Sequence, residues 1–116
     1  MEIWVNPACS KCRAATQALD EAGVDYTVRR YLDDPPTRAE LEEVLARLGL
    51  EPWDIVRFGE PQALAVEGLP RTDESRDRWL DALADNPQLI QRPIITADDG
   101  TTVVARDPES LARVLP

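Results

Sequence analysis

The sequence predicts an α/β fold made of a βαβ half and a ββα half, with a helical insertion between the two halves. Three observations support this prediction. A strand, helix, strand pattern occupies residues 3–31, two amphipathic helical blocks follow within residues 37–87, and a hairpin pattern leads into a short terminal helix. The chain has 116 residues, of which 43% are hydrophobic, so it can bury one core but not two. We therefore expect one domain over residues 1–116.

The first half begins with Ile3–Val5, a short β-prone run that the turn signal Asn6-Pro7 ends. Alanine and leucine then recur at helical spacing as far as Ala22, and Gly23 is suited to end that helix. Residues 26–31 read as a second strand. A strand, helix, strand unit favours a parallel pair with a right-handed crossover.

The helical insertion is expected over about residues 37–87. Thr37 and Glu40 have the spacing of a capping box that opens a helix, and Gly49 follows its last turn. The apolar face of this first helix consists of Leu41, Val44, Leu45 and Leu48. A second helix is predicted from about Ser75 to Asp85, with Trp79, Leu80 and Leu83 on one face. Residues 51–73 between them look irregular, apart from a short helix near Trp53.

The second half reads as a hairpin followed by a helix. Residues 94–96 and 102–105 are strand patterns around the turn 97–100, and Asp107-Pro108 opens a helix that carries Leu111 and Val114. The full order is βαβ, then helices, then ββα. This is the layout of a thioredoxin-like fold.

Composition excludes several classes of function. Acidic residues outnumber basic ones 22 to 13, and the net charge of −9 is of the wrong sign for binding nucleic acid through its phosphates. The first seven residues lack the basic start and apolar run of a signal peptide, and no apolar stretch approaches the roughly 20 residues of a membrane helix. We therefore expect a cytoplasmic protein with neither nucleic acid nor a membrane as its partner.

Cys9-Ser10-Lys11-Cys12 lies just ahead of the first predicted helix. At such a position, unpaired backbone N–H groups and the positive end of the helix dipole favour a thiolate, and Lys11 and Arg13 add positive charge nearby. Cys9 is therefore the candidate nucleophile. Cys12, one helical turn further on, can attack a sulfur adduct formed at Cys9, which makes it the candidate resolving thiol.

The cysteine pair has two other interpretations. A zinc half-site lacks its other two ligands in a chain without histidine, so we expect no metal site and no bound cofactor. Two incidental buried thiols remain an alternative. The motif does not name a substrate either, because thioredoxins, glutaredoxins, peroxide sensors and oxyanion reductases share the same chemistry.

Three arginines, Arg57, Arg92 and Arg106, occupy irregular or strand-end positions. Each alone is best explained as an exposed charge, which is the default for arginine. Together around a thiolate, however, their forked donors would suit a tetrahedral oxyanion. Arg13, next to the cysteine pair, joins them as a candidate substrate-binding residue.

Four segments resemble a known family. They are Asn-Pro-Ala-Cys-Ser-Lys-Cys-Arg at residues 6–13, Tyr-Leu-Asp-Asp-Pro-Pro-Thr-Arg at 31–38, Gln-Arg-Pro-Ile at 91–94, and Val-Leu-Pro at 114–116. In this order they resemble the glutaredoxin-linked arsenate reductases and the related Spx-type regulators of the thioredoxin-like superfamily. The resemblance spans essentially the whole chain.

This resemblance implies roles for individual residues. Cys9 would attack arsenate, while Arg57, Arg92 and Arg106 would bind the oxyanion. Pro93 would be the cis-proline that faces the active-site cysteine, since cis peptide bonds occur essentially at X-Pro.

The chain departs from the arsenate reductase pattern at two places. Val5 stands where these enzymes typically have a histidine, and Ser10-Lys11-Cys12 replaces Gly-Thr-Ser. Family members with one cysteine pass the arsenylated thiol to glutathione and glutaredoxin. Cys12 could instead release arsenite internally and leave a Cys9–Cys12 disulfide for an external thiol reductant, either glutathione with glutaredoxin or thioredoxin.

Arsenate reductase is the leading functional prediction, and two alternatives stay open. One is an Spx-type redox-sensing regulator that binds RNA polymerase, because these regulators also carry Cys-x-x-Cys and Arg-Pro-Ile. Against it, residues 6–8 and 35–38 match the reductases, and the sequence lacks the C-terminal extension of the regulators. The other alternative is a general glutathione-dependent or thiol-disulfide oxidoreductase.

Overall fold

The computed structural model describes residues 1–116, which form two compact units. Unit 1 comprises residues 1–34 and 92–116, and unit 2 comprises residues 35–91. The single domain over residues 1–116 stays a prediction. Across the chain, no helix combines the length and the apolar character needed to cross a membrane.

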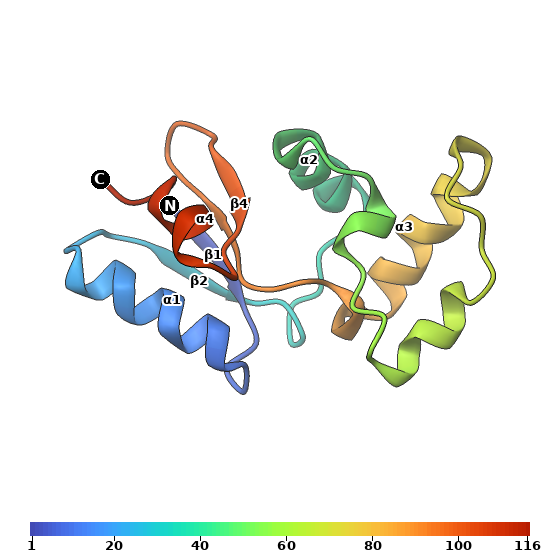
Figure 1. The fold of residues 1–116 in the computed structure, drawn as a ribbon, viewed down its shortest axis with the longest axis horizontal. Coiled ribbons are helices and arrows are strands. Elements are labelled where there is room, and N and C mark those ends of the chain that lie inside the picture. The colour runs from blue at the N-terminus through green and yellow to red at the C-terminus, as the bar shows by residue number, and fades with distance from the viewer. The chain divides into compact units, whose positions relative to one another are not determined.

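Unit 1 is built on a four-stranded sheet with strand order β2-β1-β3-β4 (Figure 1). Its elements are β1 (Glu2–Val5), α1 (Ser10–Glu21), β2 (Thr27–Arg30), β3 (Ile94–Thr96), β4 (Thr102–Val104) and α4 (Pro108–Ala112). β1 pairs with β2 in parallel, whereas β1 with β3 and β3 with β4 are antiparallel. The predicted βαβ and ββα halves are therefore confirmed.

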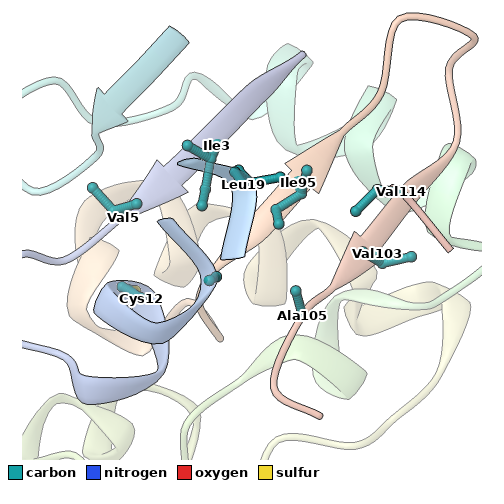
Figure 2. Packing of buried hydrophobic residues seen from close by; sticks show 9 residues of the cluster. Ile3, Val5, Cys12, Leu19, Ile95, Val103, Ala105 and Val114 are labelled. Carbon is teal, nitrogen blue, oxygen red and sulfur yellow. The ribbon is translucent and has the colours of Figure 1, made fainter. Parts of the chain in front are cut away.

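The core of unit 1 lies on one face of this sheet. Ile3 of β1 pairs with Ile95 of β3, which pairs with Val103 of β4. Residues directly opposite each other on neighbouring strands point to the same side of the sheet, so all three side chains share one face. α1 contributes Cys12, Ala15 and Leu19 to the same cluster (Figure 2). Burial of this apolar face holds the start of α1 against the end of β1.

Local signals set the limits of the helices as predicted. Gly23 and Gly49 adopt φ of 69°, the left-handed conformation that glycine adopts most readily. At the start of α2 (Arg38–Leu48), the Thr37 hydroxyl accepts from the Glu40 backbone and the Glu40 carboxylate accepts from the Thr37 backbone. The carboxylate of Asp107 caps α4 by accepting from the Ser110 N–H.

Unit 2 contains α2, α3 (Arg76–Asp85) and four short 3₁₀ helices. These are η1 (Pro52–Ile55), η2 (Pro61–Val66), η3 (Asp73–Ser75) and η4 (Pro87–Leu89). Trp79 of α3 is buried and donates through its indole N–H to the Pro70 carbonyl at 2.8 Å. Leu41, Val44 and Leu45 are buried, as expected of α2.

The structure differs from the sequence predictions in several places. β4 ends at Val104 rather than at residue 105, and α4 ends at Ala112, so that Val114 lies beyond it. Leu48 is half-buried rather than fully buried, because it lies in the last turn of α2. The stretch 51–73 contains the short helix expected near Trp53, which is η1, but η2 and the start of η3 lie where irregular chain was expected. The second strand covers residues 27–30 rather than 26–31.

Candidate active site

A tight turn between β1 and α1 delivers Cys9 to the helix terminus. The N–H of Cys9 donates to the Asn6 carbonyl at 2.9 Å, and the N–H of Ala8 donates to the Asn6 side-chain oxygen at 3.0 Å. Asparagine followed by proline is well suited to such a turn, since the side chain mimics a backbone acceptor and the ring fixes φ. Cys9 takes the N-cap position of α1 with extended backbone.

The environment of Cys9 favours its thiolate. Burial opposes ionisation, but hydrogen bonds from the backbone N–H groups of Cys12 and Lys11, from the Cys12 thiol and from Arg92 outweigh it. Together they lower the pKa of Cys9 from 9.0 to about 7. The helical N–H donors are the groups expected at this position, and the guanidinium of Arg92 acts with them, whereas the side-chain charges of Lys11 and Arg13 are not among the causes.

Cys12 is shifted in the opposite direction. It is 2% exposed, and burial is the main cause that raises its pKa to about 11. The Asn6 N–H, 3.5 Å from the Cys12 sulfur, and the charge of Arg92 work against this rise, while the charge of Cys9 and the hydrogen bond to it add to it. The pair therefore holds one thiolate and one thiol near neutral pH. Both cysteines are free, without a disulfide.

Pairing of β1 with β3 brings Arg92 and Pro93 to this turn. Trp4 lies opposite Ile94, so the residues just before β3 lie beside the residues just after β1. Arg92 is 7% exposed and contacts Cys9, and its peptide bond to Pro93 is cis, the form that the family resemblance implies. Arg106 donates to the Arg92 carbonyl at 2.7 Å, which ties the end of β4 to the same place.

The other two candidate arginines have contacts of their own. Arg13 donates to the Pro7 carbonyl at 3.3 Å and lines a pocket that contains Cys12. Arg57 belongs to unit 2, where its Nε is 3.4 Å from a carboxylate oxygen of Glu60. The structure thus brings Cys9, Cys12 and Arg92 together within unit 1, with Arg106 behind Arg92.

Two contributors to this region are not singled out by the sequence pattern. Asn6, which the sequence marks only as a turn residue, donates its backbone N–H to the Cys12 sulfur at 3.5 Å. Arg30 lines the same pocket as Arg13. The signal that could have identified Arg30 is strand alternation, because Val28 and Arg30 lie opposite Ile3 and Val5, whose side chains face α1. No cluster of three or more metal-ligating side chains is present.

Comparison with known proteins gives a consistent result. The model of the ArsC family matches residues 4–114. An uncharacterized protein in the glnII region of Streptomyces viridochromogenes is 60% identical over 99% of this chain and 98% of its own length. A protein named arsenate reductase from Neisseria meningitidis is 36% identical over 99% of this chain and 97% of its own.

Solved structures agree with this result. The structure named as an arsenate reductase from Vibrio cholerae superposes with a TM-score of 0.87 at 31% identity, covering 99% of this chain and 98% of the other. The fold of the present chain is therefore the thioredoxin-like fold of these neighbours.

Proposed function

The chain belongs to the ArsC family, and we propose that it is a thiol-dependent oxidoreductase that reduces arsenate to arsenite, with Cys9 as nucleophile and Cys12 as resolving thiol. One observation carries the assignment of roles. Cys9 has a pKa lowered to about 7 and contacts Arg92, which offers a forked cationic donor beside the sulfur. A thiolate next to a guanidinium can both hold and attack a tetrahedral oxyanion.

In the first step, the Cys9 thiolate forms a bond to arsenic and one arsenate oxygen leaves as water after taking up protons. Arg92 neutralises charge on the remaining oxygens, and Arg106 holds the carbonyl of Arg92 in place. We assign Arg106 and Arg57 to the oxyanion as well, on the family resemblance. Arg13 is the fourth candidate for this role.

In the second step, the Cys12 thiolate attacks the sulfur of Cys9. The sulfur–arsenic bond breaks, its electron pair stays on arsenic, and arsenite leaves while a Cys9–Cys12 disulfide forms. The charge on Cys9 and the hydrogen bond to it are the lesser causes that raise the pKa of Cys12, after burial, and an adduct on Cys9 removes these two lesser causes.

An external thiol must then reduce the disulfide. We place the reaction in the cytoplasm, with glutathione and glutaredoxin or thioredoxin as the external reductant. Nucleic acid and membranes have no part in the proposal, and neither does a bound cofactor.

The test is the intact mass of the fully reduced protein after incubation with arsenate and no other thiol. We expect the loss of two hydrogens and the release of one arsenite per chain, with phosphate as the inert control. Cys12→Ser should release arsenite only when glutathione and glutaredoxin are added. Arsenate-dependent turnover by Cys9→Ser with any thiol donor would refute the mechanism. An unchanged mass in the wild type would refute Cys12 as the resolving thiol.

A further inference from the structure

Unit 2 contains a cavity of about 560 Å³ that the proposed function does not use. It is lined by residues between Phe58 and Arg71 and by Trp79 of α3, so all of its lining belongs to unit 2. The volume lies within the range of sites that bind small molecules. Neither cysteine lines the cavity, and none of the arginines assigned to the oxyanion does so. The residues that form it therefore have no role yet.

Most of the lining is apolar. Trp79 is 1% exposed and forms part of the inner wall, and the ring of Phe58 meets it edge to face with the centroids 6.2 Å apart. At the mouth, Phe58 is 49% exposed and Leu64 is 74% exposed. Large apolar side chains scattered over a surface are ordinary, but those gathered around one hollow mark a binding site. A ligand of this cavity would therefore have an apolar body.

The charges of the lining favour a cation. Glu60 and Glu67 line the cavity against a single arginine, Arg71. The guanidinium of Arg71 lies over the ring of Phe58, 5.2 Å from its centroid, so this one cation already has a partner. Residues 35–91 contain 12 acidic and 6 basic residues, which makes the potential around the cavity negative as well. An anionic ligand would have to enter against this potential.

Glu67 is the carboxylate best placed to pair with such a cation. A carboxylate oxygen of Glu60 is 3.4 Å from Nε of Arg57, so part of its charge is already compensated. Glu67 is exposed at the C-cap of η2 and forms no ion pair within the chain. A ligand ammonium group that pairs with Glu67 would thus gain attraction without breaking an existing contact.

We propose that this cavity binds an organic ammonium ion with an apolar body, of the arylalkylamine class. Its ring packs against Phe58 and Leu64, and its ammonium group pairs with Glu67. The inference goes beyond the proposed function, because it concerns a binding site that has no part in the reduction of arsenate and can be tested without it.

The test measures binding of three probes to the full chain. They share a phenyl ring on a four-carbon chain and differ in the end group: 4-phenylbutylamine is cationic, 4-phenylbutanol neutral and 4-phenylbutyrate anionic. Exposed ion pairs are worth little, so we expect the amine to bind about threefold more tightly than the alcohol. The carboxylate should bind most weakly. Tighter binding of 4-phenylbutyrate than of 4-phenylbutylamine would overturn the inference.

The amide NMR spectrum of the labelled chain locates the bound probe. The indole N–H of Trp79 donates to the Pro70 carbonyl at the cavity, whereas that of Trp4 donates to the Glu2 carboxylate in unit 1. We expect saturable shifts of the Trp79 indole signal and of residues 58–71, with the Trp4 indole signal unchanged. Shifts confined to other residues would overturn the site. So would the same shifts on raising the protein concentration without a probe, because they would assign this surface to self-association.

Glu67→Gln is the diagnostic variant for charge, and Glu74→Gln is its matched control. Glu74 is also an exposed glutamate of unit 2 without an ion pair, but it does not line the cavity. Glu67→Gln should lower the affinity for the amine about threefold, to that of the alcohol, and leave the affinity for the alcohol unchanged. Glu74→Gln should preserve the preference for the amine. Equal losses in the two variants would overturn the role of Glu67.

Leu64→Ala tests the apolar contact, with Leu50→Ala as its control. Leu50 is a further exposed leucine of unit 2, at 38%, and lies outside the lining. Because the phenyl ring is common to the three probes, Leu64→Ala should weaken all of them by about threefold, whereas Leu50→Ala should weaken none. Unchanged binding in Leu64→Ala would overturn the proposed packing of the ring.

Discussion

The nucleophilicity of Cys9 gives the sharpest quantitative prediction. Its pKa of about 7 lies two units below the ordinary 9.0, which corresponds to about 3 kcal/mol in favour of the thiolate. At pH 7 about half of Cys9 is thiolate, against about 1% of an unperturbed thiol, a gain of about fiftyfold. A less basic thiolate is a weaker nucleophile, by about eightfold for two units, so the net gain at pH 7 is about sixfold.

The assay is the rate of exchange with a neutral aromatic disulfide, measured from pH 5 to 9.5 on the reduced protein. We expect a rate that rises with a midpoint near pH 7 and levels off by pH 8.5. Cys9→Ser serves as the control and should lose this phase, because Cys12 is buried and holds its proton. A midpoint at pH 8.5 or above would refute the reasoning, as would a phase near pH 7 that survives in Cys9→Ser.

Three further predictions concern stability. Because folding lowers the pKa of Cys9, its thiolate adds to the free energy of unfolding as pH rises from about 7 to 9, and this contribution is lost as pH falls through 7. The free energy of unfolding in urea, taken as wild type minus Cys9→Ser, should therefore increase by about 2 kcal/mol between pH 6.5 and 8.5. Thr37→Ala removes the hydroxyl of the capping box and should cost about 1 kcal/mol in the same assay, with Thr37→Ser restoring most of it. Leu19→Ala opens a cavity under the sheet of unit 1 and should cost about 2–5 kcal/mol, whereas Leu64→Ala, at a leucine that is 74% exposed, should change stability by less than about 0.5 kcal/mol.

Much of the fold could be predicted because its signals are local. The capping box at Thr37 and the left-handed glycines at 23 and 49 act on their own helices, so short windows of sequence contain the information. The short helix η1 was expected near Trp53, but η2 and η3 were missed for the opposite reason. A helix of three to six residues is too short to show an apolar period, and only the proline at 61 marks where η2 begins.

The cysteine pair was predictable for a similar reason, since the spacing of three residues places Cys9 and Cys12 on one face of the first helical turn. Arg13 follows Cys12 directly, and consecutive helical residues point about 100° apart, so Arg13 lines the pocket beside β2 together with Arg30.

The contact between Arg92 and Cys9 could not be derived from any local pattern, because the two residues lie far apart in the chain. It depends on the antiparallel register that sets Ile3 opposite Ile95 and Trp4 opposite Ile94. A shift of this register by one residue would turn Ile95 away from the core, so burial of that isoleucine also fixes where Arg92 lies. Apolar packing in β3 thereby positions the cation that stabilises the thiolate. It follows that Ile95→Thr, which keeps the β-branched shape but weakens the packing, should raise the pKa of Cys9 as well as lower stability. If stability fell while the pH midpoint of the exchange reaction stayed at about 7, the coupling between this core and the site would be disproved.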